Sequence, residues 1–175
     1  MTENQVPNLE TVEDMLAFVL AVENEASERY AEMAEAMDAH NNTQVAKLFR
    51  EMADVEELHA ESVQRQAAKL GIEALPVLQY EWETPEGPET GDFADLHYLM
   101  TPREALLLAR HNEEKAAAYF AELAEKLSNP EVKAMAREMA TEEREHVALV
   151  NKWLEDFPED ESEWIEDQDP PVDQG

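Results

Sequence analysis

The sequence predicts an all-α fold, a four-helix bundle made of two repeated helical hairpins with a long crossover between helices 2 and 3. Three observations lead to this prediction. Apolar residues recur with helical periodicity in four segments. Prolines and glycines gather between residues 71 and 92, where they exclude a continuous helix. The last two helical segments repeat the pattern of the first two, as expected for a duplicated hairpin.

The first hairpin is expected to contain two long helices. The first runs from about residue 9 to 38, and Thr11 and Asp14 form a T-x-x-D start of the capping-box type. A break at residues 40–42 precedes the second helix, which ends at Gly71. The apolar positions expected to face the core are Leu16, Val19, Leu20, Ala26, Tyr30, Met33, Met37, Val45, Leu48, Phe49, Met52, Val63 and Leu70.

The second hairpin follows a crossover at about 71–100. Thr101 and Pro102 cap the third helix, because proline suits the first helical turn. Asn129 and Pro130 start the fourth helix in the same way. The apolar positions expected to face the core are Leu106, Ala109, Ala116, Phe120, Leu123, Leu127, Val132, Met135, Met139, Val150 and Trp153.

Composition predicts one folded domain with a tail. The bundle is expected to occupy residues 1–155, a length that allows a substantial core. Residues 156–175 are acidic, contain prolines and have no basic residue. Like charges at this density favour an extended chain, so we expect the tail to be disordered.

Charge and composition also restrict the function. Thirteen basic against 42 acidic residues give a formal net charge of −29, which argues against nucleic acid or an anionic membrane surface as a partner. This charge suits the attraction of cations such as Fe²⁺, and solubility explains it equally well. The absence of cysteine excludes thiolate zinc, iron–sulfur and rubredoxin-type centres. No nucleotide-binding fingerprint is present. No apolar run approaches the roughly 20 residues of a membrane span, and the expected location is the cytoplasm.

The internal repeat contains the candidate metal ligands. Residues 50–59 and 137–146 both read R-E-M-A-x-x-E-x-x-H. Residues 23–35 and 113–125 both read E-x-x-A-x-x-x-[YF]-A-E-[ML]-A-E, and the first glutamate of each falls within an apolar stripe. Glu and His three residues apart lie on one face of a helix, so each E-x-x-H pair can offer an oxygen and a nitrogen to one metal ion.

Six polar residues on otherwise apolar stripes predict a dinuclear metal site. Burying several carboxylates without cations would cost many kcal/mol or force their protonation. Two divalent ions would neutralise four carboxylates and leave two neutral imidazole ligands, the set found in di-iron four-helix bundles. Oxygen-rich ligands favour iron or manganese over structural zinc. The expected ligands are Glu23, Glu56, His59, Glu113, Glu143 and His146.

Over roughly residues 10 to 155 the chain resembles the ferritin-like superfamily, and its rubrerythrin branch in particular. The motifs that carry the resemblance are E-x-x-A-x-x-x-Y at residues 23–30 and the two E-x-x-H pairs. It implies a ferritin-like bundle holding two iron ions on the six residues, with manganese or zinc as possible substitutes. The resemblance further implies that Glu56 and Glu143 bridge the two ions. Glu23 and Glu113 would then be terminal ligands.

Three comparisons with the family pattern bear on catalysis. Tyr30 matches the family's buried tyrosine and is the candidate catalytic side chain, whereas its repeat counterpart is Phe120. Rubrerythrins add a Cys-rich rubredoxin domain, which a chain without cysteine cannot contain. They also carry an extra carboxylate one turn after the third-helix glutamate, where this chain has Ala116. The six ligands without a seventh are closer to the ferroxidase centre of bacterioferritins.

The sequence is compatible with three functions. The resemblance implies a di-iron oxidoreductase that oxidises Fe(II) or reduces peroxide or O₂, supplied by an external electron donor and assembled as a homodimer or larger homo-oligomer. The alternative is an iron-binding protein that stores or delivers iron without significant turnover. A third possibility is a structural bundle whose repeat once bound metal. Redox turnover and the size of any assembly separate the first two functions.

Overall fold

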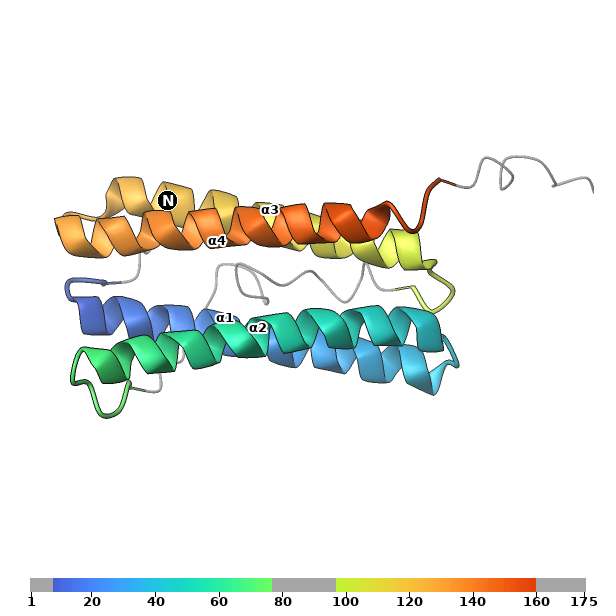
Figure 1. The fold of residues 1–175 in the computed structure, drawn as a ribbon, viewed down its shortest axis with the longest axis horizontal. Helices are drawn as coiled ribbons and strands as arrows, with labels where there is room; N and C mark the ends of the chain where they lie inside the picture. The colour runs from blue at the N-terminus through green and yellow to red at the C-terminus, as the bar shows by residue number, and fades with distance from the viewer. Residues whose placement is uncertain (1–7, 77–96, 160–175) are drawn as a thin grey trace, which may run out of the picture.

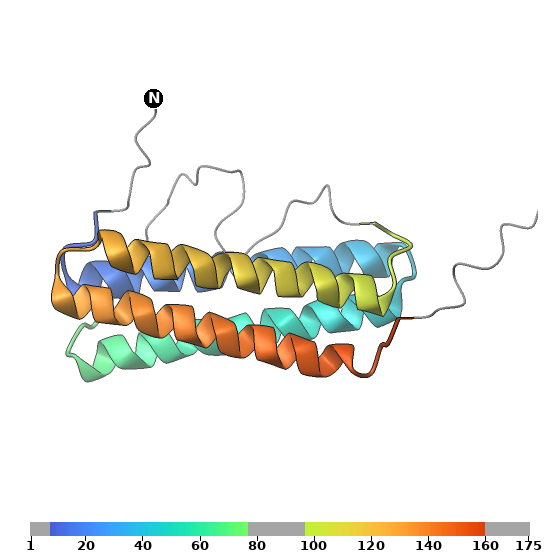
Figure 2. The same cartoon turned by 90° about the horizontal axis from the view of Figure 1, so that it is seen from above.

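The computed structural model describes residues 8–76 and 97–159. Four helices fill these ranges: α1 (Val12–Ala39), α2 (Thr43–Lys69), α3 (Pro102–Lys126) and α4 (Pro130–Leu154). Helices α1 and α2 form one antiparallel hairpin and α3 and α4 form the other, and the two hairpins face each other along their length (Figure 1). Seen from above, all four helices run close to a common direction (Figure 2). The predicted all-α four-helix bundle of two hairpins is confirmed.

Side-chain caps set most of the helix starts. The Thr11 hydroxyl accepts a hydrogen bond from the Asp14 N–H at 3.1 Å, and the Asp14 carboxylate accepts one from the Thr11 N–H at 2.9 Å. This capping box starts α1 at Val12, three residues later than the periodicity predicted, because Thr11 is still extended. Thr101 and Glu104 cap α3 in the same way. The predicted caps therefore fix the two helices that carry Glu23 and Glu113.

Helix α2 starts differently. Asn42 makes no side-chain hydrogen bond to the first turn of α2. Its amide nitrogen instead donates to the backbone oxygens of Tyr98, at 3.2 Å, and Met100, at 2.9 Å. The turn between α1 and α2 is thereby joined to the segment that leads into α3, and this contact links the two hairpins at one end of the bundle.

The connection between α2 and α3 must traverse the bundle. Helix α2 ends at one end of the molecule and α3 begins at the other, so these two helices run parallel (Figure 1). A 27-residue helix is about 40 Å long, so the end of α2 and the start of α3 lie roughly this far apart. Most of the predicted crossover, at 77–96, and most of the predicted tail, at 160–175, lie outside the described residues.

Two apolar clusters fill the interior, one toward each end of the bundle. The first contains the start of α1 and the ends of α2 and α3, with Phe18 and Phe120 packed edge to face at 6.2 Å between ring centroids. The second contains the end of α1 and the start of α2, with Tyr30 stacked on Phe49 at 6.2 Å. The six candidate ligands belong to neither cluster, and they come from the part of the bundle between the two.

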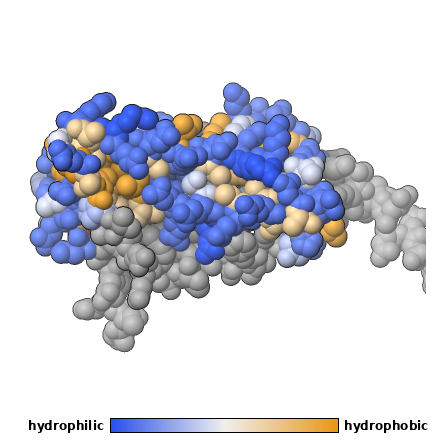
Figure 3. Space-filling view, turned by 90° about the horizontal axis from the view of Figure 1, so that it is seen from below, coloured by the Kyte–Doolittle hydropathy of each residue, from blue (hydrophilic) through white to orange (hydrophobic). Residues whose placement is uncertain are grey.

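The surface is mainly hydrophilic. Figure 3 shows hydrophilic residues over most of one face, with hydrophobic residues in separate small groups. One predicted core position is wrong: Leu70 is 57% exposed, because it forms the C-cap of α2 and lies beyond the last buried turn. Within the described residues, no helix has both the length and the apolar character needed to cross a membrane.

Candidate metal centre

The six predicted ligands come from the middle of all four helices. Helices α1 and α3 each contribute one glutamate, and α2 and α4 each contribute one Glu-x-x-His pair. Glu23, Glu56, Glu113 and Glu143 are fully buried and His146 is 4% exposed. His59 differs, because 29% of its side chain is exposed. The structure thus brings all six residues into one region, with one histidine at its edge.

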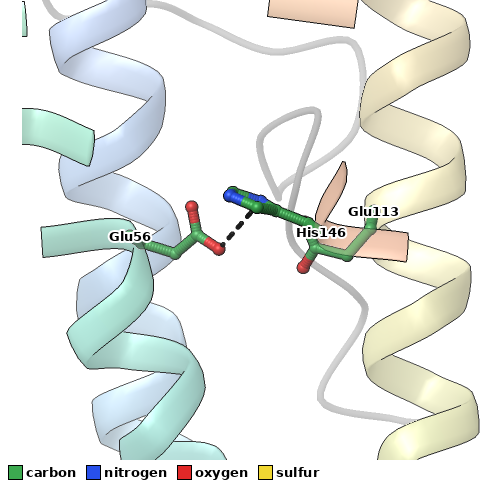
Figure 4. Close-up of side chains that lie close together, drawn as sticks. All are labelled: Glu56, Glu113 and His146. Carbon is green, nitrogen blue, oxygen red and sulfur yellow. Dashed lines mark hydrogen bonds and ion pairs between the residues drawn. The ribbon is translucent and has the colours of Figure 1, made fainter. Parts of the chain in front are cut away.

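His146 lies at the centre of this region. Its Nδ1 atom is 3.1 Å from Glu113 Oε2, 3.4 Å from Glu143 Oε2 and 3.6 Å from Glu56 Oε1. Figure 4 shows its imidazole ring between the carboxylates of Glu56 and Glu113. Glu56, Glu113 and His146 each offer a ligand atom within 4.8 Å of the other two, a spacing at which one metal ion could bind all three.

His59 closes the other side of the cluster. Its Nε2 atom lies 3.0 Å from Nε2 of His146, with the two rings nearly perpendicular. Its Nδ1 atom lies 4.0 Å from Glu23 Oε1 and 3.5 Å from Glu142 Oε2. The two histidines of the repeat therefore meet ring to ring, and between them they contact residues of all four helices.

The cluster contains buried carboxylate oxygens that accept no hydrogen bond. Both carboxylate oxygens of Glu23, Glu56 and Glu143 lack a hydrogen-bond partner although they are inaccessible to solvent. A buried polar atom without a partner costs about 1–3 kcal/mol, and a charged one costs more. Six such oxygens beside two imidazoles form the donor set of hard divalent cations such as iron or manganese. The residues present therefore fit a metal site.

The proton affinities of the cluster reflect the same crowding. Burial raises the pKa of Glu23, and the nearby charge of Glu143 raises it further. Burial, followed by the charges of Glu113 and Glu23, raises the pKa of Glu56. Burial also raises the pKa of Glu113. Without metal, these three carboxyl groups hold protons at a pH where exposed carboxyl groups are ionised.

The acidic neighbours of His146 raise the pKa of its imidazole ring. Burial by itself lowers its pKa, but the contacts with Glu113 and Glu143 and the charge of Glu56 outweigh burial and raise the pKa to about 11. At neutral pH the ring is therefore an imidazolium that donates through both nitrogens, one of them to Glu113. In the metal-free protein this cation partly neutralises the carboxylates, and it must lose a proton before it can bind a metal ion.

Tyr30, the predicted catalytic residue, contacts one candidate ligand directly. Its hydroxyl donates to Glu113 Oε1 at 2.8 Å, and the side chain is 1% exposed. Burial, then the charges of Glu113 and Glu56, raise the pKa of its phenol well above 10. Tyr30 therefore stays protonated and orients Glu113. Phe120, at the corresponding position of the repeat, packs in the apolar cluster and has no such contact to offer.

Two polar residues of the region escaped the sequence interpretation. Asn112 is fully buried next to Glu113, and neither atom of its amide has a hydrogen-bond partner. Its repeat counterpart is the buried Val22, so the apolar residue at the matching position was the available signal for its burial. Glu142 touches His59 across the hairpins. The available signal was its difference from Val55 at the corresponding position of the first hairpin.

Comparisons with known proteins agree with the fold and with the ligand motifs. The sequence profile of the rubrerythrin family matches residues 14–91 and 104–171. A crystal structure of an uncharacterised conserved protein from Magnetospirillum magnetotacticum MS-1 is 42% identical in sequence, with a TM-score of 0.59. The match covers 86% of this chain and 97% of that one. None of the curated proteins compared matches the sequence.

The raised pKa values predict how the stability of the metal-free protein depends on pH. A group whose pKa is higher in the folded than in the unfolded protein stabilises the folded state fully at a pH below its unfolded pKa. This stabilisation is lost as the pH rises toward the folded pKa. The unfolded values are 4.5 for Glu56 and 6.5 for His146, so the free energy of unfolding should fall between pH 5 and pH 8. Thermal melts in the presence of a chelator measure this change.

The variant Glu56→Gln distinguishes the pH dependence of stability that comes from the buried cluster from that which comes from the surface charge. Because the glutamine side chain stays neutral, ionisation of residue 56 in the unfolded chain no longer favours unfolding as the pH rises. We therefore expect the metal-free variant to equal the parent near pH 5 and to exceed its stability at pH 8 by about 1.4 kcal/mol or more, the equivalent of one pKa unit. Parent and variant carry the same surface charge, so its effect on the free energy of unfolding cancels in the comparison. A difference between the two proteins that does not change with pH would contradict this account of the cluster.

Proposed function

Because the chain belongs to the rubrerythrin family, we propose that its buried cluster holds two iron ions and that the protein oxidises Fe(II) or reduces peroxide or O₂ there. The observation that supports this proposal best is the set of six buried carboxylate oxygens of Glu23, Glu56 and Glu143 that have no hydrogen-bond partner. A bundle needs cations to keep so many buried acceptors ionised. Manganese or zinc could occupy the same oxygen and nitrogen donors.

The donor set divides naturally between two ions. Four carboxylates carry four negative charges, which two divalent ions neutralise, and each ion can take one imidazole nitrogen. Glu56 and Glu143, which each share a helix turn with a histidine, would contact both ions, and Glu23 and Glu113 would each contact one. Bound iron would supply electron transfer to peroxide or O₂, which is the one chemistry that the side chains lack.

The protein side chains supply positioning, shielding and access. Tyr30 holds the carboxylate of Glu113 through its hydroxyl. The two apolar clusters exclude water on either side along the bundle, which strengthens each electrostatic interaction between them. His59 brings the cluster to the surface, since it is the partly exposed member of the six. A small oxidant such as peroxide or O₂ could reach the cluster there.

Sustained turnover would need electrons from another molecule. The chain has no cysteine and hence no rubredoxin-type centre. Ala116, one turn after Glu113, is buried and provides no additional carboxylate. We therefore propose an external electron donor. From the family resemblance alone, we also propose a homodimer or larger homo-oligomer as the working assembly. Binding and delivery of iron without turnover is the second candidate, favoured by the net charge of −29 that attracts cations.

The ligand assignment makes a graded prediction for metal affinity. Glu56→Ala or Glu143→Ala should weaken binding of the second ion equivalent more than Glu23→Ala does, because a shared ligand serves both ions. We expect losses of at least about tenfold for the shared ligands, since even residues that only support a metal ligand cost about 10–100-fold. Titration of the metal-free proteins with Mn²⁺ measures both stoichiometry and affinity. A parent protein that binds fewer than two ions would contradict the assignment.

The redox proposal predicts rapid oxidation without sustained reduction. Fe²⁺-loaded protein mixed with H₂O₂ or O₂ in a stopped-flow instrument should oxidise at least about tenfold faster than the double variant His59→Ala, His146→Ala, in line with the loss of supporting metal contacts. With NADH as the reductant and no added donor protein, peroxide reduction should not continue. Equal oxidation rates in parent and variant would exclude the redox function and leave iron binding.

A further inference from the structure

The two histidines of the repeat have unequal access to solvent. The side chain of His59 is 29% exposed, whereas that of His146 is 5% exposed. Both occupy the last position of the same R-E-M-A-x-x-E-x-x-H motif, one on α2 and one on α4. Since the local sequence pattern is shared, the difference comes from what surrounds each ring. The cluster therefore reaches the solvent-exposed surface at His59, whereas His146 is enclosed.

An acidic side chain stands at the exposed side. Glu142, from α4, is 47% exposed, and its Oε2 atom lies 3.5 Å from Nδ1 of His59. Among the described residues, no lysine or arginine forms an ion pair with it. The corresponding residue of the first hairpin is Val55, so no carboxylate stands in this position relative to His146. The exposed carboxylate and the exposed histidine thus occur together, on one side of the cluster.

A buried acceptor faces the same ring nitrogen from the inside. Glu23 Oε1 lies 4.0 Å from Nδ1 of His59, and Glu23 is fully buried. Neither of its carboxylate oxygens has a hydrogen-bond partner. Three potential ligands therefore follow one another from solvent to interior: an exposed carboxylate, a half-buried imidazole and a buried carboxylate without a partner.

We propose that Glu142 and His59 form the entrance by which divalent cations reach the buried carboxylates. Glu142 captures the hydrated cation at the surface, Nδ1 of His59 replaces part of its water shell, and Glu23 receives it inside. Because each step exchanges one oxygen or nitrogen ligand for another, the cation need not cross the protein surface bare, which would be very costly. The inference rests on the proposed function in one respect, since the cluster must bind cations.

Removing a residue of the entrance changes the rates of cation binding in a way that removing a ligand or a positioning residue does not. A group that contacts the cation only in transit lowers the barrier equally in both directions. Its removal should therefore slow association and dissociation by the same factor and leave the dissociation constant unchanged. A ligand present in the bound state, or a residue that orients His59, would change the dissociation constant.

The test uses Co²⁺ as the probe and the metal-free full-length protein. We expect Glu142→Gln to slow Co²⁺ association by about tenfold at low ionic strength, the lower range of electrostatic effects on association rates, with two ions bound and the dissociation constant within about twofold of the parent. Glu142→Asp, which keeps the carboxylate, should restore most of the rate. Glu35→Gln is the charge-matched control, because it removes one exposed carboxylate on α1 about 18 Å along the helix from Glu23.

The outcomes separate this inference from the proposed function. An association rate unchanged in Glu142→Gln would overturn the entrance, as would an equal slowing in Glu35→Gln, which would show a general charge effect. A weakened dissociation constant at an unchanged association rate would instead make Glu142 a ligand or a positioning residue, and would likewise overturn the entrance. A parent protein that takes up no Co²⁺, Mn²⁺ or Fe²⁺ would overturn the proposed function and the entrance with it.

Discussion

The burial of four carboxylates at the middle of one helix bundle is the constraint on which the rest of this structure depends. Ionised carboxylates in a medium of low dielectric constant repel one another and lose their hydration. The metal-free protein reduces this penalty in two ways, by raised pKa values at Glu23, Glu56 and Glu113 and by the imidazolium of His146. Neither protonation nor the imidazolium gives every buried carboxylate oxygen a hydrogen-bond donor. Two divalent cations would instead bind these oxygens directly.

The stability of the bundle comes mainly from regions outside the cluster. Apolar side chains pack toward both ends, around Phe18 and Phe120 at one end and around Tyr30 and Phe49 at the other. This division lets the middle of each helix carry charged residues that oppose folding when no metal is present. The internal repeat then doubles one helical hairpin and brings its two E-x-x-H pairs together. Differences between the repeats, such as a glutamate at 142 where the first hairpin has a valine, make the two sides of the cluster inequivalent.

Much of this architecture could be predicted from the sequence, because its determinants are local. Capping residues and helical periodicity gave the four helices, and the repeat gave the six polar residues that the bundle brings together. Features set by contacts between hairpins could not be predicted. Periodicity placed Leu70 in the core, but it lies past the last buried turn. The contact of Glu142 with His59 has no signature in the spacing of residues. The burial of Asn112 does have one, since Asn112 lies three residues after Ala109 and four before Ala116.

We propose that the six side chains bind two ions in one buried cluster. Anomalous diffraction from crystals of the Mn²⁺-loaded protein tests it most directly, because it locates each ion without reference to activity. We expect two anomalous peaks about 3.5–4 Å apart, the separation of other dinuclear centres. Each peak should lie within bonding distance of one of the two histidines, His59 or His146. Peaks confined to surface carboxylates, or a single ion in the cluster, would contradict it.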